Sequence, residues 1–236
     1  MTERGMIFNA EMVRAILDGR KTQTRRIVKP QREGDGWSVK ETQAPMSARH
    51  THDWWLPTAI RPYSALPGCP YGVVGDRIWV RETFQGPLFN YDQMDAYSKD
   101  SSMFERPEFC IYRADGKAAP EYYDADDNLQ CRWRPSIHMP RWASRITLEI
   151  TDVRVERLNS ISEADAAAEG VGSDLWFAAN GVPEEEWTSL GEHGAERVSH
   201  INTFATLWES IYGAESWQAN PWVWVIEFEQ VYEVVE

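Results

Sequence analysis

The stretch Gly19-Arg20-Lys21-Thr22-Gln23-Thr24-Arg25-Arg26 decides how the rest of the chain is interpreted, because it joins an expected helix to an expected strand. It gathers one amine, two hydroxyls and three guanidinium groups. In a strand from Thr22 to Val28 the side chains alternate, so the even-numbered residues share one face and the odd-numbered residues share the other. A basic turn exposed to solvent or phosphate is one interpretation of this run, and a chemical site is the other.

Lys21 is the residue of this stretch that is best suited to unusual chemistry. Its neighbours Arg20, Arg25 and Arg26 are all cationic and disfavour a further positive charge, and burial would add to their effect. We therefore expect a lowered pKa for the Lys21 amine. A lysine that is neutral near neutral pH can accept a proton from a threonine hydroxyl.

The segments next to this stretch predict a helix and several strands. Asn9 is a good N-cap, an apolar helical stripe occupies residues 12–17, and Gly19 is a natural helix stop. Strand patterns follow at residues 77–84 and, as two consecutive runs, at residues 144–158. Helices and strands are thus mixed along the chain, which predicts the α+β class.

The second half of the chain adds two expected helices and a final strand. Ser162-Glu163-Ala164-Asp165 begins a short helix with a capping-box pattern, and Gly170 ends it. This helix carries Glu169 in its last turn. An amphipathic helix is expected around residues 204–211. Residues 222–228 are nearly all apolar, which predicts a strand that is buried on both faces.

Three polar stretches lack any sustained periodicity, and we expect them to be long insertions: residues 31–72, 85–135 and 172–198. Short strands are expected within the second of them, around residues 109–112 and 130–133. A chain of 236 residues that is 42% hydrophobic can bury a sizeable core. We expect one elaborated domain that spans residues 1–236.

The charge distribution points to a small ligand. The formal net charge of −13 argues against general affinity for nucleic acid, because that affinity depends on lysine and arginine. Between residues 14 and 32, however, seven basic residues meet only one acidic residue, a local balance of +6. One basic pocket in an acidic protein suggests a small polar or anionic ligand. No apolar run approaches membrane-spanning length, so we expect a soluble, cytoplasmic monomer that binds no membrane.

The cysteines do not predict a disulfide framework or a metal site. Cys69, Cys110 and Cys131 are an odd number at wide spacing, without a Cys-x-x-Cys pair. His50-Thr51-His52 adds two imidazoles, but neither group has a spacing that recurs in zinc sites. We expect no metal and no cofactor.

Four features, taken in order, resemble the ASCH domain family: the Gly19 to Arg26 run, Gly75-Asp76 before a strand, Glu169 in a helix after a strand pair, and the late strand at Val225-Ile226-Glu227-Phe228. The resemblance covers residues 7–29, 72–84, 144–170 and 222–229. It implies a small PUA-like β-barrel with flanking short helices, which here would carry the long polar insertions. The insertions make the chain similar to larger ASCH-like proteins of phages and prophages.

The resemblance to amidohydrolases within this family implies a metal-independent enzyme that removes the acyl group from N4-acylated cytosine or cytidine. It implies that Thr24 is the nucleophile, Lys21 the base and Glu169 the acid or base. Proton transfer needs near contact, so these three should converge on one pocket. The alternative is that Glu169 activates a water while Thr24 positions the acyl group. Residues expected to bind the substrate are Arg20, Arg26, Trp79 and Trp224.

A second function stays open at this point. A non-catalytic module of phage origin could use the same basic pocket to bind RNA or a nucleotide. The combination of an amine, a hydroxyl and a carboxylate favours catalysis, because a binding pocket has little need for a buried acid beside its cations. We therefore expect a small nucleoside or nucleobase as the ligand, with RNA as the alternative.

Overall fold

The computed structural model describes residues 1–32, 34, 36–123, 128–172 and 199–232. Strands from distant parts of the chain pair with one another and helices lie between them, so the α+β class is confirmed. The chain divides into two compact units, each made of separate segments. Unit 1 contains residues 1–18, 76–149 and 230–236, and unit 2 contains residues 19–75 and 150–229. The single domain expected from the sequence stays a prediction.

The largest sheet has five strands in the order β1-β6-β11-β12-β2. β1 (Glu3–Ile7) runs parallel to β6 (Arg77–Arg81), and β6 runs antiparallel to the start of β11 (Thr147–Arg157). β12 (Trp222–Val231) runs antiparallel to β2 (Gln23–Ile27). Because β1 and β2 end this order without pairing to each other, no closed barrel is detected among the described residues.

Unit 1 begins with β1 and with α1 (Ala10–Leu17). The helix is confirmed where the sequence predicted it. Asn9 is its N-cap, and the Asn9 side chain accepts a hydrogen bond from the Met12 N–H at 2.8 Å. The unit also contains α2 and two small antiparallel sheets, formed by β7 with β8 and by β9 with β10. Their bounds are α2 (Met94–Lys99), β7 (Phe84–Gln85), β8 (Ile111–Tyr112), β9 (Glu121–Tyr123) and β10 (Leu129–Cys131).

Short 3₁₀ helices connect many of these elements. In unit 1 they are η1 (Tyr91–Gln93), η2 (Ser101–Phe104), η3 (Pro107–Phe109), η4 (Arg113–Asp115), η5 (Ser136–His138) and η6 (Arg141–Ala143). In unit 2, η7 (Leu158–Ser160) follows β11. The first segment of unit 2 adds a three-stranded antiparallel sheet of β3 (Ser38–Glu41), β4 (His52–Trp55) and β5 (Ser64–Ala65).

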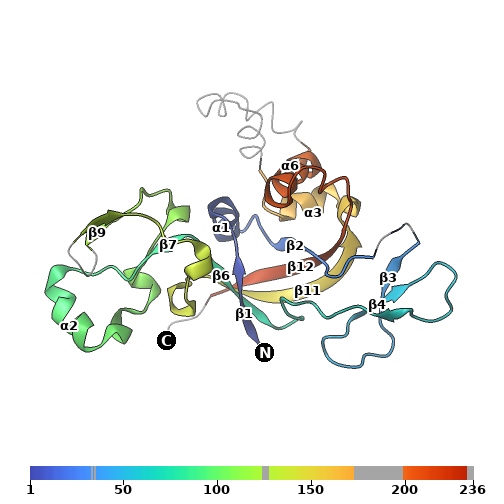
Figure 1. Ribbon diagram of the computed structural model, residues 1–236, viewed down its shortest axis with the longest axis horizontal. Helices are drawn as coiled ribbons and strands as arrows, with labels where there is room; N and C mark the ends of the chain where they lie inside the picture. The colour runs from blue at the N-terminus through green and yellow to red at the C-terminus, as the bar shows by residue number, and fades with distance from the viewer. Residues whose placement is uncertain (33, 35, 124–127, 173–198, 233–236) are drawn as a thin grey trace. The chain divides into compact units, whose positions relative to one another are not determined.

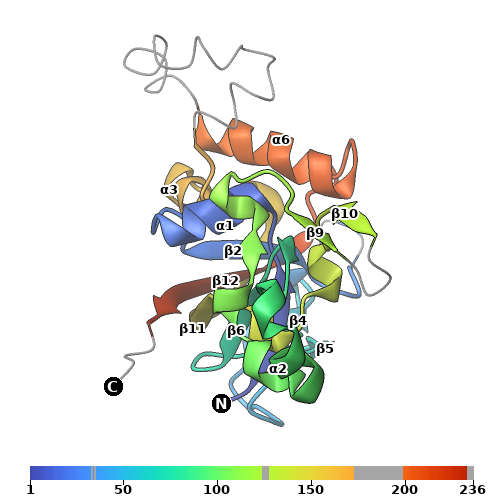
Figure 2. The same cartoon turned by 90° about the vertical axis from the view of Figure 1, so that its left-hand side faces the viewer.

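Unit 2 buries β12 on both faces. α3 (Glu163–Ala168) and α6 (His200–Tyr212) lie on one side of β2 and β12 (Figures 1 and 2). Val223 and Val225 of β12 pack with Phe204 of α6 in one apolar cluster. On the other side of β12, the ring of Trp222 meets that of Trp54 from β4, with 5.6 Å between the centroids. The strand that the sequence predicted to be buried on both faces is therefore confirmed.

The structure differs from the sequence predictions in two segments. Residues 31–72, expected to be irregular, contain the β3-β4-β5 sheet with an almost inaccessible Trp54. These strands are only four, four and two residues long, too short for a clear alternation. The two strand runs expected in residues 144–158 form the single strand β11. Most of the third expected insertion, residues 173–198, lies outside the described residues.

Within the described residues, no helix combines the length and the apolar character that crossing a membrane requires. Cys69, Cys110 and Cys131 form no disulfide among the described residues, and the first two are buried.

Candidate functional site

The site begins where the Gly19 to Arg26 run enters unit 2. Gly19 has a left-handed conformation with φ of 72°, which a residue without a side chain adopts readily. Lys21 then forms an isolated antiparallel bridge with Glu169, and β2 begins two residues later. Glu169 is the C-cap of α3, a helix whose N-cap Ser162 accepts a hydrogen bond from the Asp165 N–H. Both ends of α3 are thus fixed, which holds Glu169 over the start of β2.

Lys21 and Glu169 meet although 148 residues separate them in the chain. The Lys21 Nζ donates to the Glu169 Oε2 at 2.9 Å and to the Glu169 backbone oxygen at 2.7 Å. The two side chains are 0% and 2% exposed. A neutral amine has two N–H groups, and Glu169 supplies an acceptor for each of them. The lone pair of the Lys21 nitrogen is then left to accept a proton.

Burial lowers the pKa of the Lys21 amine, and the nearby Arg26 and Arg25 lower it further. The ion pair and hydrogen bond with Glu169 act in the opposite direction without cancelling the effect of burial. The sequence predicted this direction from the arginine neighbours. In the structure the largest cause is the removal of the amine from water.

Arg25 holds the second oxygen of the Glu169 carboxylate, a role that was not predicted from the sequence. Its Nη1 donates to the Glu169 Oε1 at 3.1 Å, and its side chain is 0% exposed. The Arg25 Nη2 lies 3.5 Å from the Glu156 Oε2 and 3.9 Å from the Asp165 Oδ2. The Arg25 Nε and Nη2 make no hydrogen bond among the described residues. Glu169 therefore joins the buried Lys21 amine and the buried Arg25 guanidinium through its two oxygens.

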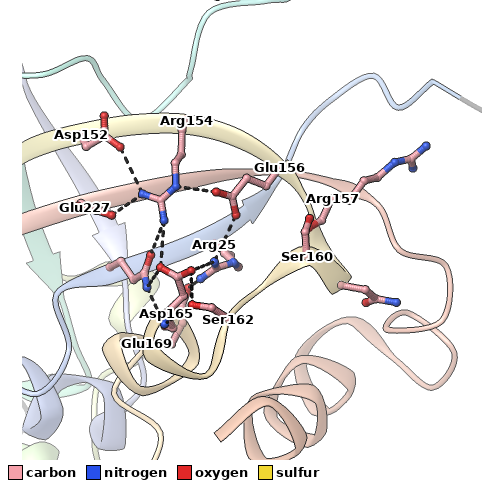
Figure 3. A network of polar contacts seen from close by, with 12 residues as sticks. Arg25, Asp152, Arg154, Glu156, Arg157, Ser160, Ser162, Asp165, Glu169 and Glu227 are labelled. Carbon is pink, nitrogen blue, oxygen red and sulfur yellow. Dashed lines mark hydrogen bonds and ion pairs between the residues drawn. The ribbon is translucent and has the colours of Figure 1, made fainter. Parts of the chain in front are cut away.

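Arg154 of β11 forms the outer part of the same network (Figure 3). Its Nε donates to the Glu156 Oε1 at 2.7 Å, and its Nη2 to the Asp165 Oδ1 at 3.1 Å. Its Nη1 donates to Asp152 at 3.3 Å and also to Glu227 of β12. Asp152, Arg154 and Glu156 alternate along β11, and this period of two is the signal from which their shared face could have been predicted.

Thr24 is not joined to this network. It is buried and lies opposite Ile226 in the pairing of β2 with β12. Its neighbours Gln23 and Arg25 both contact α3, where the Gln23 side chain donates to the Asp165 backbone oxygen at 2.7 Å. Alternation directs Thr24 to the opposite face of β2. Among the described residues, the Thr24 hydroxyl makes no hydrogen bond to Lys21 or Glu169.

The residues expected to bind substrate lie in several places. The Arg20 Nη1 donates to the Gly170 backbone oxygen at 3.3 Å, next to Glu169. Arg26 is half-buried and lies opposite Trp224 in the pairing of β2 with β12. Trp224 is buried, with its ring edge-on to that of His52 at 6.0 Å between centroids. Trp79 belongs to β6 of unit 1.

Among the residues that the structure describes, no group of three or more histidine, cysteine, aspartate or glutamate side chains is placed to hold a metal ion. The site consists of a buried amine, a carboxylate that holds it, and a guanidinium on the second carboxylate oxygen. Comparisons of this chain with protein-family models, with curated proteins and with solved structures find no match.

Proposed function

We propose that this protein is an ASCH-type amidohydrolase that removes the acyl group from N4-acylated cytosine, cytidine or a related nucleoside without a metal ion. The order of elements supports the proposal, because a helix ends before Gly19, a strand follows Lys21, and a short helix brings Glu169 back to it. A PUA-like arrangement of the strands around this site is part of the same proposal.

The observation that carries the proposal is the covered Lys21 amine, held by both the backbone oxygen and the carboxylate of Glu169. Moving a charged ammonium group out of water is costly, so burial favours the neutral amine. A neutral amine can act as a general base near neutral pH, which an exposed lysine cannot do efficiently. Glu169 would then orient the Lys21 nitrogen rather than carry the proton itself.

In the proposed reaction, an oxygen nucleophile attacks the acyl carbonyl carbon while its proton passes to the Lys21 nitrogen. The bond between that carbon and N4 then breaks, and the proton moves from Lys21 to the departing N4. One water is consumed, and the products are a carboxylic acid and the free amino-pyrimidine. With Thr24 as the nucleophile, an ester forms first on its hydroxyl, and a water releases the acid in a second step.

The position of Thr24 favours water as the nucleophile. Gln23 and Arg25 occupy the face of β2 that meets α3, so alternation turns the Thr24 hydroxyl away from the Lys21 amine. Thr22 is a matched control, because it belongs to the same run and is exposed. If Thr24→Ala loses activity while Thr22→Ala and Thr24→Ser keep it, the nucleophile is the Thr24 hydroxyl.

The decisive experiment incubates the purified protein with N4-acetylcytidine and measures cytidine by chromatography, with and without a chelator. Lys21→Met should lose about 100-fold or more in kcat/KM, because it keeps the length of the side chain but removes the base. Lys117→Met, at an exposed lysine in unit 1, should match the parent protein. Hydrolysis by Lys21→Met at the parent rate would exclude Lys21 as the base.

A parent protein that bound N4-acetylcytidine without hydrolysing it would instead support the binding-module function. The same assay with single-stranded RNA would then show whether the ligand is a nucleoside or a strand. Strong salt dependence of that binding would indicate phosphate contacts.

A further inference from the structure

A cavity of 670 Å³ lies in unit 2, away from the Lys21–Glu169 pair. It is bounded by the segment that joins β3 to β4 and by Val153 of β11. Its volume exceeds that of a nucleoside, and small-molecule sites in proteins commonly have this size. Apart from Val153, its lining comes from residues 31–72, one of the expected insertions.

His50 fixes the wall of this cavity. Its Nδ1 accepts a hydrogen bond from the Met46 backbone N–H at 3.1 Å, so a neutral ring carries its proton on Nε2. That Nε2 lies 2.8 Å from the Asp53 Oδ1, and both side chains are buried. The His50 backbone N–H also donates to the Ser47 oxygen at 3.0 Å. The segment between β3 and β4 is thus held in a defined conformation by three hydrogen bonds.

His52 supplies a nitrogen to the cavity. Its side chain is more than nine-tenths buried, and its Nδ1 lies 2.9 Å from the Thr51 Oγ1. Burial lowers the pKa of the His52 ring, which is therefore neutral near neutral pH. When the Thr51 hydroxyl donates to Nδ1, the ring proton is on Nε2. Among the described residues, the His52 Nε2 has no hydrogen-bond partner.

Glu41 places a carboxylate beside this ring. It lies directly opposite His52 in the antiparallel pairing of β3 with β4, and such residues point to the same face of a sheet. Both residues line the cavity. Its described lining contains no lysine or arginine, so an anionic group has no cation to meet there. The lining instead places the His52 ring nitrogen next to the charged Glu41 acceptor.

We propose that this cavity binds a nucleobase that carries an exocyclic amino group beside an unprotonated ring nitrogen, as cytosine and adenine do. The amino group would donate to Glu41, the pairing by which carboxylates recognise cytosine N4. The ring nitrogen would accept from the His52 Nε2–H. Uracil and hypoxanthine present a carbonyl oxygen to Glu41 instead, and two acceptors facing each other repel. The inference goes beyond the hydrolase proposal, because no step of it uses Lys21.

The test is a calorimetric titration of the whole protein with cytidine, adenosine, uridine and inosine. Cytidine and adenosine should bind about tenfold or more tightly than uridine and inosine. Glu41→Gln should weaken cytidine binding about tenfold, because it replaces a charged acceptor by a neutral one of the same shape. His52→Phe should do the same while keeping an aromatic ring against Trp224. Glu229→Gln, at an exposed acid of β12, is the matched control.

Cytidine should also shift the His52 imidazole signals in NMR spectra of the parent protein and of Lys21→Met. Equal affinity for cytidine and uridine, or no binding of either, would overturn the inference. The inference would also be overturned if Lys21→Met lost cytidine binding while Glu41→Gln bound cytidine as the parent protein does. Cytidine would then occupy the Lys21 site. Glu41 is exposed, so Glu41→Gln still gives an answer if His52→Phe does not fold. Failure of the hydrolase assay leaves this binding test unaffected.

Discussion

The two faces of β2 are both buried, but they are buried in different ways. The odd-numbered face carries Gln23 and Arg25, which contact carboxylates from α3 and β11. On the even-numbered face, Thr24 lies opposite the apolar Ile226 of β12. Charge on the first face needs partners from several elements, whereas packing alone suffices around Thr24 on the second. Removal of a charge should therefore disturb the fold far more on the first face than loss of a hydroxyl on the second.

Arg25→Met should give the largest loss of stability. The substitution leaves the buried Glu169 carboxylate with only the Lys21 amine as a partner, and it removes the contacts to Glu156 and Asp165. Breaking a buried ion pair from one side typically costs about 3–5 kcal/mol of unfolding free energy. The unfolding free energy is measured by urea denaturation, with circular dichroism as the signal. A loss below about 1 kcal/mol would show that Arg25 contributes no more than a surface residue.

The pH dependence of stability should report the covered Lys21 amine. Its pKa in the folded protein is below the ordinary value of 10.5, so the unfolded chain binds the proton more strongly. The parent protein should therefore gain stability as pH rises from the lowered folded pKa to about 10.5, with a slope of at most about 1.4 kcal/mol per pH unit. Below the folded pKa the amine is charged in both the folded and the unfolded protein, so the full cost of burying this charge lowers the stability.

Lys21→Met provides the reference for this measurement, because it lacks the titrating amine and keeps the other lysines. The difference in unfolding free energy between the parent protein and Lys21→Met should change across that pH range. A difference that stayed constant from pH 7 to 10.5 would mean that Lys21 titrates alike in the folded and unfolded protein.

Arg154→Met should have a smaller effect than Arg25→Met, although Arg154 contacts more carboxylates. Its side chain is 27% exposed, so solvent screens these ion pairs and can take their place. We expect a loss of about 1 kcal/mol, reduced further in high salt. An Arg154→Met loss equal to that of Arg25→Met would remove the distinction between the inner and outer parts of the network.

Thr24→Val should have the smallest effect on stability. The Thr24 hydroxyl makes no hydrogen bond among the described residues, and valine has nearly the same shape. We expect a change of less than about 1 kcal/mol in unfolding free energy, similar to that of Thr22→Val. A much larger loss would reveal a polar role for the even-numbered face.

The sequence predicted the alternation of β2 correctly, and with it the shared face of Gln23 and Arg25. It also predicted the direction of the Lys21 pKa. The partners of Arg25 were missed because they come from residues 156–169, and local periodicity carries no information on which distant segments meet. The β3-β4-β5 sheet was missed because its strands are too short to show a period. Nothing in local sequence indicates the cavity that this sheet helps to form.

The bridge between Lys21 and Glu169 also has a consequence for the order of folding. It closes a loop of 148 residues, and contacts of such long range form late, because the chain must first lose the freedom of everything between them. During synthesis, α1 and β2 leave the ribosome long before α3. The amine of Lys21 therefore remains hydrated and charged in the nascent chain, and it is withdrawn from water only when the last third of the protein arrives.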